Sequence, residues 1–378
     1  MRPSSAAKTM KRRTMLSLLA ALPATTAFSR ESGNLVLGQS APATGPAAQL
    51  GIQLNRGARL YFDKVNAAGG VNGQKIELRM LDDGYEPPRA KANTETFLNA
   101  DVFALFGYVG TPTSLASMPL VKDSGIPFFG PFTGAMALRQ PALRNVFHVR
   151  ASYDDETALI VNQLHHLGLS KIAVFRQNDS YGQAGLDGTT KALKALGLAP
   201  VAVGTVERNT VKVEDAVKAI VAAQPDGVVQ ISSYKSCAEF IRQARKAGYG
   251  GQFFNVSFVG TKALSDELSK DALGVVVSQV MPYPFSPAVA IVRDYLDAVK
   301  AAGDATANYS SLEGYVDARV FVEGLRRGRA NTREALASGL ESLQHVDFDG
   351  FNLNFGREHA ASHFVELSML TGDGGVRR

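Results

Sequence analysis

The stretch from Leu35 to Asp83, LVLGQSAPATGPAAQLGIQLNRGARLYFDKVNAAGGVNGQKIELRMLDD, carries the clearest fold signal of this chain. It holds an apolar run, a loop of small residues, an amphipathic segment, a glycine-rich stop and a second apolar run, at 35–38, 39–46, about 49–66, 69–73 and 76–81. This order predicts strand, loop, helix and parallel strand, which is one βαβ unit. Ligands of such sheets bind in loops beyond the carboxyl ends of the strands. The loop at 39–46 offers hydroxyls and backbone amides but no acid, base or nucleophile, so we expect it to hold a ligand rather than react with it.

The same alternation of apolar runs and amphipathic segments continues along the chain. Further strands are predicted at 103–107, 126–130, 146–150, 171–176, 201–205, 227–231, 252–255, 275–279, 351–354 and 364–370. Further helices are predicted at 114–123, 157–167, 181–197, 213–223, 237–247 and 312–327. The pattern predicts an α/β fold with mainly parallel sheets. About 350 residues after the leader are too many for one ordinary core, so we expect two domains.

Five motifs along the chain carry a resemblance to a known family. They are Thr44-Gly45-Pro46, the turn from Asn66 to Lys75, Asp82-Asp83, Asp179-Ser180-Tyr181-Gly182 and the segment from Arg242 to Gly248. Their order resembles the solute-binding proteins of branched-chain amino-acid type ABC transporters, the Leu/Ile/Val-binding protein family, over nearly all of the chain after residue 29.

The resemblance implies the periplasmic binding protein type I fold. Two Rossmann-like lobes with mainly parallel sheets are then joined by a hinge, and the chain returns to lobe 1 at Met281-Pro282-Tyr283-Pro284. The implied division gives lobe 1 residues 30–151 and 282–356, and lobe 2 residues 152–281 and 357–378.

Residues 1–29 have the pattern of a secretory signal peptide. Lys11-Arg12-Arg13 precedes an apolar run at 15–22 that is too short to span a bilayer. Export follows either the general secretory route or the twin-arginine route, which Arg12-Arg13-Thr14-Met15-Leu16 partly matches; the alternative is a disordered basic tail. We expect a periplasmic protein with no lipid anchor and no direct insertion into the membrane.

Charge and cysteine content limit the partners. The formal net charge is +5, and residues 1–29 contain five basic residues and no acid, so the remaining chain is about neutral. A neutral chain predicts no nucleic-acid surface. Cys237 is the only cysteine, which rules out an intramolecular disulfide, and its place in an apolar-periodic helix predicts a buried thiol.

The loops after the strands of the first half supply candidate ligand contacts. Thr111 follows Gly110 at a strand-to-helix turn, and the resemblance implies that a hydroxyl residue here holds the ligand carboxylate, as helix N-termini favour anions. Its alternative role is a plain helix N-cap. Thr133 and Gly134 stand in the second loop, where the resemblance implies small and hydroxyl residues. Phe132 is either a pocket wall or a core residue.

The second half supplies mainly aromatic and hydroxyl candidates. The resemblance implies that Tyr181 lines the cleft, and a phenol suits a ligand with apolar and polar parts; the alternative is a turn residue packed on the first helical turn. Ser233 falls where the resemblance implies a tyrosine in amino-acid binders, and Tyr234 could substitute from the adjacent position. Tyr153, at the expected junction of the lobes, is a further candidate.

Ser257 is the main departure from the family pattern. The resemblance implies a glutamate here, which pairs with the α-ammonium of a branched-chain amino acid. A serine cannot neutralise a buried ammonium, and an unpaired buried charge is costly. We expect the ligand to be a small carboxylate-bearing solute, either an amino acid or an aromatic or aliphatic acid, and the serine favours an acid without an α-amino group. Glu313 could instead supply the negative charge, or be a helix-surface or hinge residue.

Reactive sites are not predicted. The sequence contains no nucleophile elbow, Walker A loop or dinucleotide fingerprint, so we do not expect an enzyme. His165 and His166 are adjacent and face different ways on a helix, and His359 and His363 have no third ligand nearby. We expect no metal and no cofactor.

The sequence thus predicts the extracytoplasmic substrate-binding component of an ABC transporter, which closes on its ligand by a hinge. The expected partners are a small molecule and the membrane permease subunits, and we expect a monomer. The alternative is the ligand-sensing subunit of a signalling or regulatory system, which would need a separate partner.

Overall fold

The computed structural model of the protein describes residues 33–303, 306–356 and 359–378. The predicted signal peptide at 1–29 lies outside the described residues. The described chain contains two large sheets, which define lobe 1 and lobe 2, and a small two-stranded sheet of β11 (Val346–Asp347) and β12 (Asn352–Leu353).

The sheet of lobe 1 has five parallel strands in the order β2-β1-β3-β4-β5. They are β1 (Leu35–Ala41), β2 (Ile76–Asp82), β3 (Ala104–Phe106), β4 (Phe128–Phe129) and β5 (Val146–Phe147). Leu35 pairs with Ile76 and Ala41 with Asp82, so β1 and β2 end together at their carboxyl ends. This confirms the βαβ unit predicted from the opening stretch.

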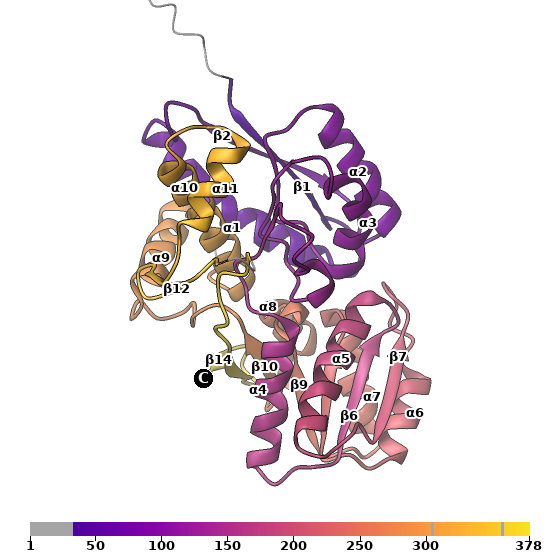
Figure 1. Ribbon diagram of the computed structural model, residues 1–378. Helices are drawn as coiled ribbons and strands as arrows, with labels where there is room; N and C mark the ends of the chain where they lie inside the picture. The colour runs from indigo at the N-terminus through magenta and orange to yellow at the C-terminus, as the bar shows by residue number, and fades with distance from the viewer. Residues whose placement is uncertain (1–32, 304–305, 357–358) are drawn as a thin grey trace, which may run out of the picture. The chain divides into compact units, whose positions relative to one another are not determined.

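Helices cover both faces of the lobe 1 sheet (Figure 1). One face carries α2 (Pro87–Asn99) and α3 (Thr111–Val121), and the other carries α1 (Ala48–Ala67), α9 (Ala290–Ala302), α10 (Tyr309–Gly328) and α11 (Arg333–Glu341). Alternate strand residues face the two sides of the sheet. Leu105 belongs to the same buried cluster as Phe97 of α2, whereas Phe106 contacts Phe62 of α1 at 5.4 Å and Phe321 of α10 at 5.9 Å between ring centroids.

The sheet of lobe 2 repeats the same strand order. It runs β14-β13-β10-β9-β8-β6-β7, so β7-β6-β8-β9-β10 corresponds to β2-β1-β3-β4-β5 of lobe 1. The strands are β6 (Ile172–Gln177), β7 (Ala202–Val206), β8 (Gly227–Ile231), β9 (Gln252–Asn255), β10 (Val276–Gln279), β13 (Glu366–Leu370) and β14 (Val376–Arg377). The strands β6 to β10 are parallel, and β13 joins β10 in antiparallel register. Each sheet therefore has a topological switch point, beside β1 and beside β6, where ligands of such folds bind.

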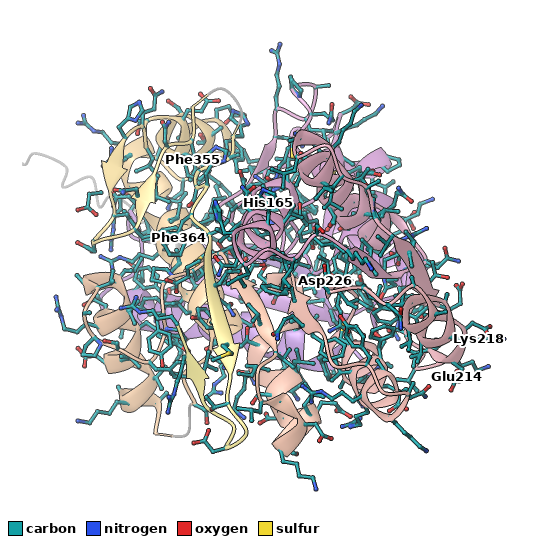
Figure 2. The ribbon with its side chains drawn as sticks, turned by 90° about the horizontal axis from the view of Figure 1, so that it is seen from below. His165, Glu214, Lys218, Asp226, Phe355 and Phe364 are labelled. Atoms are coloured by element: carbon teal, nitrogen blue, oxygen red, sulfur yellow. The ribbon has the colours of Figure 1, made fainter. Side chains whose placement is uncertain are left out.

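The helices of lobe 2 are also amphipathic. They are α4 (Tyr153–His166), α5 (Ser180–Ala195), α6 (Glu214–Ala222), α7 (Tyr234–Lys246) and α8 (Thr261–Leu268). On α6, Val217 and Ile220 are buried, whereas Glu214 and Lys218 lie at the outer edge of the molecule (Figure 2). Cys237 on α7 is buried and free, as predicted.

Several element boundaries differ from the sequence prediction. Helix α4 begins at Tyr153 rather than 157, because Ser152 and Asp155 form a reciprocal capping box. The strands β4 and β5 have two residues each, much shorter than the predicted runs. The helices α2, α8, α9 and α11 were not predicted. Helix α2 shows why: its sequence PPRAKANTETFLN buries only Ala90, Thr94 and Phe97, which leaves no clear apolar stripe.

The chain between the lobes crosses more than once. After β5 it enters α4 of lobe 2, and after β10 it returns to α9, which packs against α1. Ala360 then forms a parallel bridge with His148, directly after β5, before the chain continues into β13 of the lobe 2 sheet. The tail is thus bonded to both sheets. In the part of the chain that the structure describes, no helix is long and apolar enough to cross a membrane.

Candidate ligand-binding site

The hydroxyls of the first loop have structural partners. Ser40 donates a hydrogen bond of 2.8 Å to Asp83, and Thr44 donates one of 2.7 Å to Asp82. Burial would raise the pKa of Asp82, but hydrogen bonds from Ala43, Thr44 and Gly84 outweigh it and hold the pKa below its usual range. The expectation that this loop holds a ligand is therefore not supported for these two hydroxyls, which instead tie β1 to the end of β2.

The two threonines chosen in lobe 1 lie together. Thr111 begins α3 and Thr133 follows β4, and their hydroxyl oxygens are 2.7 Å apart. The residue that caps α3 is Gly110, and the hydroxyl of Thr111 makes no capping hydrogen bond. Thr133 also accepts a hydrogen bond of 3.2 Å from the amide of Ala135. Both side chains are buried at the carboxyl edge of the lobe 1 sheet.

Aromatic rings from both lobes meet beside this threonine pair. Phe258, which follows β9, lies 5.8 Å from Tyr85, 5.6 Å from Phe132 and 4.6 Å from Tyr181 between ring centroids. Tyr181 lies 5.4 Å from Tyr153. Tyr85 and Phe132 belong to lobe 1, and Tyr153, Tyr181 and Phe258 belong to lobe 2. The group of tilted rings therefore spans both lobes. The sequence had left Phe132 open between a wall and core packing, and it does contact the opposite lobe.

Arg150 is the buried cation of this region. It lies between β5 and α4, is 1% exposed, and its guanidinium carbon stands 4.6 Å from the centroid of the Phe132 ring. Its Nη2 donates a hydrogen bond to the hydroxyl of Ser257. Its Nη1 has no hydrogen-bond partner among the described residues. Together, Tyr85, Thr111, Phe132, Thr133, Arg150, Tyr153, Tyr181 and Phe258 form what we call the inter-lobe cluster.

Glu156, in the first turn of α4, is the acid of lobe 2 that lies beside Arg150. Its carboxylate accepts hydrogen bonds from the amide of Ser257 at 2.7 Å, the hydroxyl of Ser257 at 3.0 Å and the hydroxyl of Ser278 at 2.6 Å. Its Oε1 is 3.8 Å from Nη2 of Arg150. Burial raises the pKa of Glu156, against the effect of Arg150 and these hydrogen bonds. Ser257 is thus occupied by protein partners on both sides.

Helix α10 of lobe 1 brings two further acids to this region, and one of them, Glu313, pairs with Arg150. Glu313 Oε1 is 3.5 Å from Arg150 Nε, and Glu313 is buried rather than on the helix surface. Burial raises the pKa of Glu313 to about 7, against the attraction of Arg150. Burial also raises the pKa of Asp317, one helical turn further, well above its usual range. Burial opposes the charge of Arg150 too, but Glu313 and Glu156 outweigh it and raise the pKa of the guanidinium.

The other predicted residues divide into two groups. Gly134 belongs with the cluster, because a Cβ at this position would lie 2.8 Å from the Tyr153 ring. Ser233 and Tyr234 are buried at the start of α7, but their contacts lie elsewhere. The hydroxyl of Ser233 is 3.3 Å from that of Ser236. Burial raises the pKa of Tyr234 and the backbone of Gln49 opposes this, which places the Tyr234 phenol against α1 of lobe 1.

The rim of the cluster carries polar contacts between the lobes. Glu86 of lobe 1 accepts hydrogen bonds from Asn209 at 2.7 Å and Arg208 at 3.2 Å. Arg208 also pairs with Asp179 at 3.3 Å. Gln177 lies beneath and donates to the phenol of Tyr85 at 3.3 Å. We call Glu86, Arg208 and Asn209 the rim latch.

The sequence from residue 35 to residue 374 matches the family model described as periplasmic binding protein. The chain belongs to this family. It is 25% identical to the Leu/Ile/Val-binding protein homolog 8 of Brucella suis biovar 1, over 92% of this chain and 91% of that protein. An amino acid binding protein of Pseudomonas aeruginosa is 28% identical, and that match spans 64% of each protein. The crystal structure of a possible leucine/isoleucine/valine-binding protein from Rhodopirellula baltica SH 1 is 35% identical, covers 93% of this chain and 97% of that one, and superposes with a TM-score of 0.88.

The match establishes the class of this periplasmic binding protein. Its family consists of extracytoplasmic proteins that bind small molecules and work with ABC transporters, and they are not enzymes. The two-lobed α/β fold agrees with the solved structures of the family. The resemblance stated from the sequence motifs is therefore confirmed.

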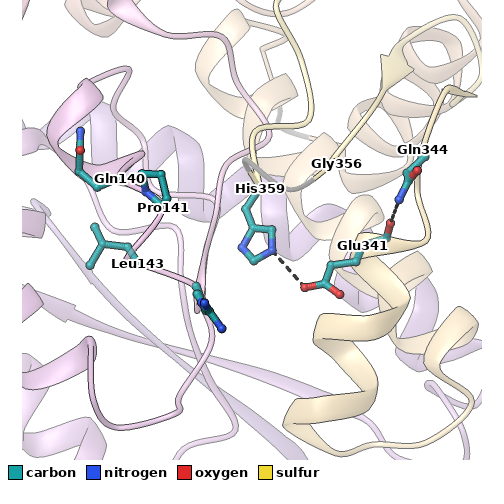
Figure 3. A pocket seen from close by; sticks show the side chains of 8 residues that line it. Gln140, Pro141, Leu143, Glu341, Gln344, Gly356 and His359 are labelled. Carbon is teal, nitrogen blue, oxygen red and sulfur yellow. Dashed lines mark hydrogen bonds and ion pairs between the residues drawn. The ribbon is translucent and has the colours of Figure 1, made fainter.

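A surface pocket of about 390 Å³ lies elsewhere on this periplasmic binding protein (Figure 3). It is lined by Gln140, Pro141, Leu143, Arg144, Glu341, Gln344, Gly356 and His359, none of which belongs to the inter-lobe cluster. His359 Nε2 is 3.1 Å from Glu341 Oε1, and the His359 ring stacks on Phe147. His363 pairs instead with Asp155. No group of three or more metal-ligating side chains occurs among residues 33–303, 306–356 and 359–378.

The sequence prediction missed Arg150, Glu156, Tyr85 and Phe258. Arg150 had a usable signal, because a lone arginine closes the predicted strand at 146–150 and an unpaired buried charge needs a function or a partner. Tyr85 follows the Asp82-Asp83 strand end, so its position beyond a carboxyl end was also readable. Glu156 carried no such signal, because it stands among other acids in the first turn of α4.

Proposed function

We propose that the protein is the extracytoplasmic substrate-binding component of an ABC transporter that captures a small carboxylate-bearing solute by hinge closure. The observation that carries this proposal is the inter-lobe cluster. It combines a threonine pair at a helix start, 2.7 Å apart, with aromatic rings from both lobes at the carboxyl ends of both sheets. Hydroxyls and helix amides suit a carboxylate, and the rings suit an apolar body.

The binding residues follow from the same geometry. Thr111, Thr133 and Gly134 form the lobe 1 surface on which the carboxylate lands, with Phe132 beside it. Tyr153 and Tyr181 then close over the ligand from lobe 2. Ser233, Tyr234 and Ser257 stay in the proposal as outer residues of the lobe 2 wall, because their contacts are with protein partners.

Hinge closure supplies the signal that a transporter needs. A ligand that touches both lobes binds the closed form more tightly than the open form, and this difference in affinity drives closure. The lobes comprise residues 30–151 with 282–356 and residues 152–281 with 357–378. The closed monomer then docks on the permease subunits, and separate cytoplasmic subunits hydrolyse ATP. Export by the leader at 1–29 places the protein in the periplasm.

A thermal-shift panel tests this proposal. The purified protein is heated with short aliphatic acids, aromatic acids, amino acids and, as a control, neutral sugars. A ligand at about 100 times its dissociation constant adds roughly 2.7 kcal/mol of stability, which is readily measured. We expect shifts with carboxylate compounds and none with sugars. A shift with sugars alone would refute the carboxylate site.

A further inference from the structure

The inter-lobe cluster contains buried hydrogen-bond donors that have no partner among the described residues. The phenol of Tyr181 and Nη1 of Arg150 are buried and have no hydrogen-bond partner among the described residues. The phenol of Tyr153 lies near Thr133 and Gly134 without meeting the geometry of a hydrogen bond. Buried polar groups are normally paired, so a set of unpaired donors in one place matches a ligand that supplies acceptors.

The acids around Arg150 do not accept hydrogen bonds from all of its donors. Glu156 already accepts hydrogen bonds from Ser257 and Ser278 and faces Arg150 as well. Glu313 Oε1 lies 3.5 Å from Nε of the guanidinium, but neither Nε nor Nη1 makes a hydrogen bond among the described residues, so both can donate to a ligand. The oxygens of Asp317 have no hydrogen-bond partner among the described residues, and burial raises the pKa of this carboxyl well above its usual range, which opposes its negative charge.

We propose that Arg150 determines ligand specificity: its guanidinium supplies the positive charge for the ligand carboxylate and excludes an α-ammonium, so the substrate class is aliphatic or aromatic carboxylic acids without an α-amino group. This inference rests on the proposed function, because it assigns the ligand of the same site. An ammonium next to the carboxylate would lie near a buried arginine whose two acidic neighbours, Glu156 and Glu313, already pair with it at 3.8 Å and 3.5 Å. Charges interact strongly there because water is excluded. The face of Phe132, 4.6 Å from the guanidinium, keeps the cation turned toward the cluster.

Matched pairs of ligands test the inference on the unmodified protein. Isothermal calorimetry compares 4-methylpentanoate with leucine and 3-phenylpropionate with phenylalanine, which differ only in the α-amino group. We expect the acid of each pair that binds to do so at least about tenfold more tightly, the ratio of one charge-assisted hydrogen bond. Equal or tighter binding of the amino acids would overturn the inference and leave the proposed function standing. No binding by any of the four, together with a blank thermal-shift panel, would refute the proposed function itself.

Variants then assign the effect to Arg150. Arg150→Gln is expected to lower acid affinity at least about tenfold and to reduce the preference over the amino acid, whereas Arg150→Lys loses less because the charge stays. Arg319→Gln is the control, because this arginine pairs with Asp294 and Asp349 outside the cluster. Circular dichroism checks that each variant is folded. If Arg150→Gln does not fold, Arg150→Gln with Glu313→Gln removes the cation and one neighbouring acid together.

Two outcomes would reject the assignment. Unchanged acid affinity and preference in a folded Arg150→Gln protein would make Arg150 a purely structural link between Glu156 and Glu313. A preference for the amino acids that disappears in Asp317→Asn would instead identify Asp317 as an ammonium partner.

Discussion

At the scale of single residues, the threonine pair is the sharpest feature of the site. Thr111→Val keeps the shape of the side chain and removes the hydroxyl that stands 2.7 Å from Thr133. We expect ligand affinity to fall about tenfold to a hundredfold, because a hydrogen bond to a charged group contributes about 1.5–3 kcal/mol. Calorimetry with the tightest acid of the panel measures the change.

The matched control for this variant is Thr189→Val. Thr189 is also buried, and its hydroxyl donates to the carbonyl of Gly185 within α5 at 2.8 Å. It shares the chemistry of Thr111 but lies outside the cluster. Equal losses of affinity in the two variants would mean that the effect of Thr111→Val is on the fold and not on the ligand.

Glu313 gives a pH-dependent prediction. The Glu313 carboxyl has Arg150, Glu156 and Asp317 as ionisable neighbours, and burial raises its pKa from the ordinary 4.5 to about 7. A carboxyl with a raised pKa contributes its full stability below about 4.5 and loses it as the pH rises through about 7. The free energy of unfolding should therefore fall between these values.

Glu313→Gln isolates this contribution. The loss of stability between pH 4.5 and 8 should be smaller in the variant than in the parent protein, by an amount on the order of 1–3 kcal/mol. Urea unfolding at several pH values measures both. Parallel stability curves for the two proteins would contradict the raised pKa.

At the scale of elements, the close crossing of α1 and α10 holds lobe 1 together. A Cβ on Gly57 of α1 would overlap the backbone of Ser311, and a Cβ on Gly314 of α10 would overlap the backbone of Leu54. The two glycines let the helices approach until their backbones touch. Because Glu313 is adjacent to Gly314, this crossing also positions the Glu313 carboxyl relative to Arg150.

Gly57→Ala should push the two helices apart. We expect a loss of about 1–3 kcal/mol in the free energy of unfolding, the range for an extra methyl group in a packed core. Gly250→Ala is the control, because nothing lies within 4 Å of a Cβ at that exposed position. Thermal unfolding compares them, and an unchanged melting temperature for Gly57→Ala would refute the tight crossing.

At the scale of the whole molecule, the rim latch should help to hold the closed form. Glu86 is the only member from lobe 1 and contacts both Arg208 and Asn209. Its side chain is 42% exposed, so solvent screens the pairs and the contribution is small. Glu86→Ala should weaken ligand binding about two- to fivefold by lowering the fraction of the closed form.

Glu323→Ala controls for the loss of a partly exposed ion pair. Glu323 pairs with Arg327 within α10 at 2.8 Å and so bridges no lobes. Calorimetry gives the affinities, and small-angle scattering with and without ligand reports the degree of closure. If Glu86→Ala and Glu323→Ala bind and close alike, the latch does not stabilise the closed form.

Local elements were predicted from the sequence better than contacts between elements. Local pattern predicted β8 and β9 to the residue, and β1, β2 and α1 to within a few residues, because periodicity and glycine stops are read from neighbours in the chain. It missed α2, whose buried residues are few. The sequence also predicted that Thr111 and Thr133 lie in one site, because the carboxyl ends of parallel strands meet at one edge of a sheet, and the two hydroxyls do lie together.

The α/β class, the family and the two sheet edges, that of lobe 1 with the threonines and that of lobe 2 with Tyr181, could all be read from the sequence, since motifs and strand ends are local features. Three features became visible only in the folded molecule: Arg150 is buried between Glu156 and Glu313, Ser257 has protein partners, and Tyr234 lies toward α1. The physical reason is that, apart from the pair of Arg150 and Glu156, these contacts join residues more than a hundred positions apart and depend on how the two lobes and α10 pack. Burial raises the pKa of Glu156 and Glu313, and these side chains become buried only when the lobes and α10 have packed.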